Sequence, residues 1–182
     1  MLELNWCNAP NNAPEYKTSF MQYKEWESLR KDIKNIVEEF NISPSHFEPI
    51  GIHDDWAKIE EKIYQTFCRI DRSTTKPIWL WEYFKLDTVS LLVDDPFPLL
   101  EQLIDSEENI WFFVNGNRGK FWFYQGKLAA ILKVIFESTY IDELYLASKK
   151  YEWLICINHH NVLIATGEIM PERLRSILNI KS

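Results

Sequence analysis

The chain has 182 residues, of which 46% are hydrophobic and 26% are charged, and its formal net charge is -7. A chain of this length and composition can bury a core without disulfides or metals, so we expect one ordered globular domain spanning residues 1–182. The acidic balance argues against a nucleic-acid partner, because general nucleic-acid binders need a basic surface to displace counterions from phosphates. A basic protein partner would suit this charge.

The chain has three cysteines, Cys7, Cys68 and Cys156, which are widely spaced and form no CxxC pair. This pattern predicts neither a disulfide framework nor a zinc site and is typical of reduced thiols. No basic-then-apolar leader is present, and no run approaches 18 apolar residues. We therefore expect a cytoplasmic protein that neither binds nor crosses a membrane.

Residues 1–72 are expected to form an arm and a helical layer. Residues 1–18 combine asparagine and proline with few apolar side chains, which favours an arm lying on the body. From Phe20 to Phe40, and again from Trp56 to Ile70, apolar residues recur every three or four positions. This spacing predicts two amphipathic helices before any strand. The polar run RSTTKP, residues 72–77, marks the boundary to a mixed body at 77–182.

After Pro77 the pattern changes to short β-rich runs and short helices. Strands are expected at 78–83 and 87–93, followed by a hairpin that joins 111–114 to 121–124. Asp95 and Pro96 resemble a cap and a first helical residue, and Pro171 opens the last helix in the same way. A further helix is expected over 127–137, and a further strand over 141–147.

The firmest pattern lies at 145–168, where two apolar runs, 153–157 and 162–165, flank a polar turn containing His159 and His160. Both runs are apolar at successive positions, which is typical of strands covered on both faces at a sheet centre. The predicted fold class is therefore α+β, with two N-terminal amphipathic helices followed by a largely antiparallel sheet that has helices packed on it.

The segment SKKYEWL at 148–154, followed by NHH at 158–160 and VLI at 162–164, resembles a family of small uncharacterised bacterial proteins. The resemblance extends back to WLWE at 79–82. It implies a bacterial cytosolic protein. It carries no assigned activity and no catalytic residue.

His159 and His160, together with Cys156, are the most evident candidates for metal binding or acid-base chemistry. Adjacent residues of a strand point to opposite faces, and no HExxH motif or second Cys/His group supplies further ligands. A structural turn is therefore favoured. The sequence predicts no metal site, no cofactor and no catalytic residue, because no nucleophile with a recognisable base is present either.

Aromatic residues provide the remaining indication of function. On the predicted strands, Trp79, Trp81 and Tyr83 would share one face, and Trp122 and Tyr124 would share another. Most aromatic side chains fill the core, and any that stay exposed predict a protein-binding surface. The candidate binding residues are Trp79, Trp81, Trp122, Tyr124, His159 and His160.

The leading hypothesis is a non-catalytic, cytosolic bacterial interaction protein, immunity- or antitoxin-like, that occludes a basic protein partner. The alternative is a small enzyme or ligand-binding protein with a pocket near His159 or His160, and a third reading is a homodimer subunit. A pocket at either histidine, with a carboxylate orienting the ring, would favour the alternative. A flat acidic face with exposed Trp or Tyr would favour the interaction protein.

Overall fold

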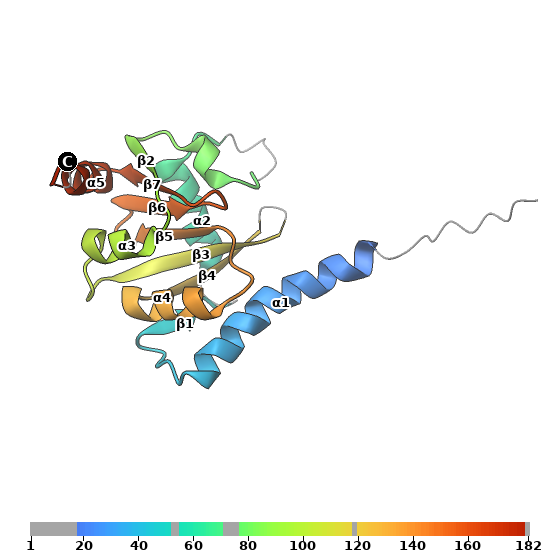
Figure 1. The fold of residues 1–182 in the computed structure, drawn as a ribbon. Helices are drawn as coiled ribbons and strands as arrows, with labels where there is room; N and C mark the ends of the chain where they lie inside the picture. Colours follow the sequence, from blue (N-terminus) through green and yellow to red (C-terminus); the bar gives the residue numbers. More distant parts are fainter. Residues whose placement is uncertain (1–17, 52–54, 71–76, 118–119, 181–182) are drawn as a thin grey trace, which may run out of the picture.

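The computed structural model describes residues 18–51, 55–70, 77–117 and 120–180, which form one seven-stranded sheet with helices on both faces (Figure 1). The strand order is β1-β4-β3-β5-β6-β7-β2, and every neighbouring pair is antiparallel. The strands are β1 (Phe47–Pro49), β2 (Thr88–Leu92), β3 (Asn109–Asn117), β4 (Lys120–Lys127), β5 (Leu144–Ser148), β6 (Trp153–Ile157) and β7 (Val162–Gly167). The helices are α1 (Thr18–Glu39), α2 (Trp56–Phe67), α3 (Phe97–Leu103), α4 (Leu128–Glu137), α5 (Met170–Ile180) and the 3-10 helix η1 (Leu80–Tyr83).

The α+β class and the antiparallel sheet are confirmed, but the predicted order of two helices before any strand is wrong. Strand β1 lies between α1 and α2 and pairs with β4 at the edge of the sheet, with Phe47 opposite Gly126. A three-residue strand that ends in proline is too short to show alternation in sequence. The available signal was Gly126, because a Cβ there would lie 2.5 Å from the carbonyl oxygen of His46.

The strand expected at 78–83 is also wrong, because Leu80–Tyr83 forms η1. Leu80 is fully buried whereas Trp79 is 44% exposed, so neighbouring side chains point to different environments from a tight helical turn rather than from a strand. Trp79, Trp81 and Tyr83 therefore do not share one strand face. An aromatic-rich run of this length satisfies the strand pattern equally well.

The predicted sheet centre is confirmed by β6, in which every residue is buried. Trp153, Ile155 and Ile157 belong to the core beneath α1, α3, α4 and α5. Leu154 and Cys156 belong to the core beneath α2 and η1. Figure 1 shows α3 and α4 on one side of the sheet and α2 on the other. The strand is thus covered on both faces, as its apolar run indicates.

Helix α1 packs on the sheet over β3 and against α4. Its residues Leu29 and Ile33 enter the core, and Asp32 accepts a hydrogen bond of 2.6 Å from the hydroxyl of Ser138, just after α4. Within the described ranges, no helix is long and apolar enough to cross a membrane. The expected arm and most of the polar connection at 72–77 lie outside the described residues.

Candidate functional site

A buried carboxylate, that of Glu143, joins three separate parts of the fold. The side chain lies just before β5 and is 6% exposed. It accepts hydrogen bonds from the hydroxyl of Tyr145 at 2.6 Å and from the indole N–H of Trp81 at 3.1 Å. The Nδ1 atom of His159 lies 3.5 Å from the same carboxylate. Glu143 therefore ties together β5, η1 and the turn between β6 and β7.

Tyr145 extends this network toward the interior. Its hydroxyl also accepts a hydrogen bond of 3.1 Å from the backbone N–H of Leu80. Burial raises the pKa of this phenol, and the neighbouring Cys156 and Glu143 act in the same direction. The hydroxyl therefore stays protonated and donates a hydrogen bond to the carboxylate. Burial also raises the pKa of the Cys156 thiol. A buried thiol of this kind is inert rather than nucleophilic.

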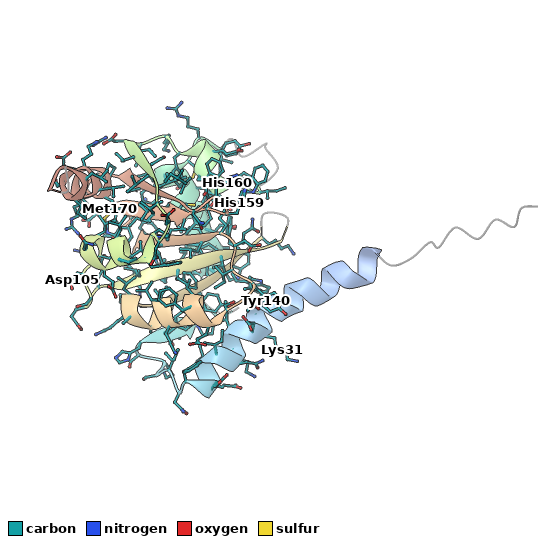
Figure 2. All side chains as sticks on the ribbon, viewed as in Figure 1. Lys31, Asp105, Tyr140, His159, His160 and Met170 are labelled. Atoms are coloured by element: carbon teal, nitrogen blue, oxygen red, sulfur yellow. The ribbon has the colours of Figure 1, made fainter. Side chains whose placement is uncertain are left out.

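The turn that carries the two histidines is built around Asn158. The side-chain oxygen of Asn158 accepts hydrogen bonds from the backbone N–H groups of His160 and Val162, at 3.0 and 3.1 Å. This turn leaves the His159 and His160 rings exposed, with their centroids 4.0 Å apart. Figure 2 shows the two labelled histidines beside one another. The Trp79 ring lies 5.7 Å from that of His159.

A carboxylate opposite Nδ1 orients a histidine ring and leaves its Nε2 atom for other contacts. In the part of the chain that the structure describes, His159 has no serine, threonine or cysteine hydrogen-bond partner, and no group of three His, Cys, Asp or Glu side chains is placed to hold a metal ion. What the arrangement provides is an imidazole ring between a buried carboxylate and an exposed tryptophan.

Large apolar side chains remain exposed around this network. Ile78 is 52% exposed, Trp79 is 44% exposed and Tyr83 is 36% exposed, whereas Trp81 is half-buried. We call the surface formed by Ile78, Trp79, Tyr83 and His159 the η1 face. It is an apolar surface, and the segment that carries it is hydrogen-bonded to the sheet from beneath.

Trp122 and Tyr124 lie at a second place, between α1, β1 and β4. Two adjoining cavities of about 560 and 280 Å³ open there, and both are lined by Arg30, Pro49, Trp122 and Tyr124. The guanidinium carbon of Arg30 lies 4.9 Å from the centroid of the Trp122 ring. We call this place the α1 cleft. Neither His159 nor His160 lines it, and Figure 2 shows Lys31 of the cleft well separated from both.

The six candidate binding residues thus fall into two groups. One group surrounds Glu143 and contains Trp79, Trp81, His159 and His160. The other is the pair in the α1 cleft. Sequence reasoning missed Glu143, Tyr145 and Arg30, because their partners are distant in the chain and no local spacing indicates them.

A protein-family model described as "Family of unknown function (DUF6756)" matches residues 25–178. No match was found among curated proteins or solved structures. The matched range includes both the Glu143 network and the α1 cleft. Because it covers most of the chain, this protein belongs to the DUF6756 family, whose function is unknown.

Proposed function

We propose that this protein is a non-catalytic interaction protein that binds a basic protein partner through the η1 face. The observation that carries the proposal is the exposure of Ile78, Trp79 and Tyr83 on one short segment. Exposed apolar groups gathered in this way are typical of a protein-binding surface, and tryptophan and tyrosine are common binding hot spots.

The η1 face is supported by a rigid base. Trp81 donates its indole N–H to the buried carboxylate of Glu143, and the backbone N–H of Leu80 bonds to the hydroxyl of Tyr145. The Nδ1 atom of His159 lies 3.5 Å from the same carboxylate, and its ring lies against Trp79. A surface that is ordered before binding loses less conformational entropy when a partner docks. This favours tight binding by a few exposed anchors.

Charge indicates the class of partner. The whole chain has a net charge of -7, and two exposed carboxylates belong to the segments that carry or support the η1 face: Glu82 lies in η1, and Asp142 precedes Glu143. A negative field accelerates association with a cationic protein and opposes binding of an acidic one. The finer proposal is an immunity- or antitoxin-like role in the bacterial cytosol, in which the η1 face occludes a cationic nuclease.

A second candidate is an enzyme or ligand-binding protein that acts at His159 or His160. It is favoured by the single observation that Glu143 faces Nδ1 of His159. Saturable binding of a small molecule that is lost in His159→Ala and kept in Trp79→Phe would support it. The two cavities described above lie instead at the α1 cleft.

The test compares capture by the wild-type chain and by Trp79→Ala in extract of the native host, followed by native mass spectrometry of the purified pair. We expect a basic protein in a one-to-one complex, weakened at least about tenfold by Trp79→Ala, as for a hot-spot aromatic. Added salt should slow association. The matched control is Tyr140→Ala, because Tyr140 is 50% exposed but lies away from the labelled histidines (Figure 2).

Three outcomes would contradict the proposal. The first is an acidic partner, and the second is a partner that Trp79→Ala binds as tightly as the wild-type chain does. The third is that no protein other than a second copy of the chain is bound in a stoichiometric complex.

A further inference from the structure

The α1 cleft is distinct from the η1 face and has the dimensions of a small-molecule site. Its cavities, of about 560 and 280 Å³, meet at Arg30, Pro49, Trp122 and Tyr124. Small-molecule sites are mostly apolar clefts of about 300–1,000 Å³ with a few convergent polar groups. The larger cavity lies within this range, and the polar groups of the cleft indicate which ligands it would accept.

The charged residues described in the cleft are mostly cations. The larger cavity is lined by Arg30, Lys31 and Lys34. The smaller cavity is lined by Arg30, Lys120 and one acidic residue, Glu60. This concentration of positive charge is opposite to the net charge of -7 of the whole chain. It is therefore a local feature, and a cationic cleft within an acidic protein attracts anions.

Tyr124 supplies a second, independent indication. It is only 4% exposed and lines both cavities, yet none of the hydrogen bonds found among the described residues involves its hydroxyl. Burial raises the pKa of this phenol, and the charge of Arg30, which lines both cavities together with Tyr124, acts in the opposite direction. A hydroxyl that lines a cavity beside a guanidinium is suited to donate a hydrogen bond to an anionic acceptor.

The remaining walls are apolar. Trp122 presents its ring beneath Arg30, and Ile33, Val37 and Pro49 surround the larger cavity. An indole ring packs well against a flat apolar group. A free inorganic anion would use the cations and leave these walls in contact with water, whereas an anion with an apolar body would use both.

From these observations we infer that the α1 cleft binds a small amphipathic anion. Its carboxylate or phosphate group contacts the Arg30 guanidinium and the Tyr124 hydroxyl, and its flat apolar body packs on Trp122. Guanidinium groups pair with both kinds of anion in a two-pronged geometry, so the chemistry is shared between carboxylates and phosphate esters. No residue of the η1 face lines the α1 cleft, so ligand binding in the cleft can be tested independently of the partner protein.

The test is isothermal titration of the full chain with four probes: 1-naphthoate, 1-naphthyl phosphate, inorganic phosphate and neutral 1-naphthol. We expect one saturable site for at least one naphthyl anion, and the comparison of the two shows whether carboxylate or phosphate is preferred. Inorganic phosphate and 1-naphthol should each bind at least about tenfold more weakly, because each lacks half of the contacts. Equal binding of the neutral probe, or no saturable binding of either naphthyl anion, would overturn the inference.

Variants locate the site. Arg30→Gln should weaken binding of the naphthyl anion at least about tenfold, and Arg30→Lys less, because the charge remains but the guanidinium fork is lost. The matched control is Arg175→Gln on α5, at the opposite edge of the sheet, where Arg175 pairs with Asp87. It removes the same charge and should leave affinity unchanged. An equal loss in both variants would show a general charge effect and would contradict a site at Arg30.

Discussion

Tyr145 and Tyr124 are two buried phenols in two very different regions. Tyr145 is fully buried in the Glu143 network, where its hydroxyl accepts from Leu80 and donates to Glu143. Tyr124 is 4% exposed in the α1 cleft, and its hydroxyl takes part in none of the hydrogen bonds between described residues. In the Glu143 network the Tyr145 hydroxyl both donates and accepts a hydrogen bond, and we call this network closed. It joins η1 to the segment that contains Glu143 and β5. In the α1 cleft the Tyr124 side chain lines the same cavities as the Arg30 guanidinium, which is an arrangement expected of a site for a ligand.

The largest expected effect comes from breaking the closed network. Glu143→Ala should lower the free energy of unfolding by about 3 kcal/mol, because the Tyr145 hydroxyl and the Trp81 indole lose a charged acceptor. Arg30→Gln in the open cleft should change it by less than about 0.5 kcal/mol. Urea unfolding followed by far-ultraviolet circular dichroism measures both. If the two variants lost similar amounts of unfolding free energy, the Glu143 network and the α1 cleft would not differ in their structural role.

Replacing tyrosine by phenylalanine in each region compares the contribution of the two hydroxyls to the free energy of unfolding. Tyr145→Phe removes a hydroxyl with two partners and should cost about 1–2 kcal/mol of unfolding free energy. Tyr124→Phe removes a hydroxyl that serves no described partner and should cost less than about 0.5 kcal/mol. If Tyr124→Phe proved as costly as Tyr145→Phe in urea unfolding, the cleft would have a structural role.

Cys68 and Cys156 lie in the same core as Tyr145, so their reactivity tests how well this side of the sheet excludes solvent. Burial raises the pKa of Cys68 to about 12, with Lys85 opposing the shift, and burial raises the pKa of Cys156 as well. Both should therefore resist iodoacetamide at mildly alkaline pH, because the thiolate is the reactive form. Glu143→Ala should accelerate labelling of Cys156, measured by peptide mass spectrometry. Rapid labelling of Cys156 in the native wild-type chain would contradict a closed network.

The smallest effect is expected at an exposed pair that belongs to neither region. Two hydrogen bonds of 2.9 Å from Arg175 hold the pKa of Asp87 below its usual value of 3.8. A carboxyl with a lowered pKa contributes stability above its usual pKa, and this contribution is lost as the pH falls through the folded value. Asp87→Asn should therefore slightly flatten the loss of stability below pH 3.8, measured by thermal unfolding. An unchanged acid profile would show that the pair is too well solvated to matter.

The parts of the fold that sequence predicted are those with strong local patterns. The doubly apolar run at 153–157 marked an interior strand, β6, and the spacing of apolar residues marked α1 and α2. The parts it missed depend on distant contacts: β1 exists because Gly126 admits its backbone, and η1 is held by Glu143 from a later segment. The same holds for the sites. His159 and Trp79 were conspicuous as single residues, but nothing local indicated that Glu143 would join their segments.

The most direct test of the proposed function is hydrogen–deuterium exchange of the chain, alone and in its purified one-to-one complex with the captured basic protein. We expect binding to increase protection at residues 78–86 and 158–161, which carry the η1 face and the histidine turn. Protection at the α1 cleft should be unchanged. Protection confined to the cleft or to α3 and α4, with no change at 78–86, would show that the partner does not bind at the η1 face.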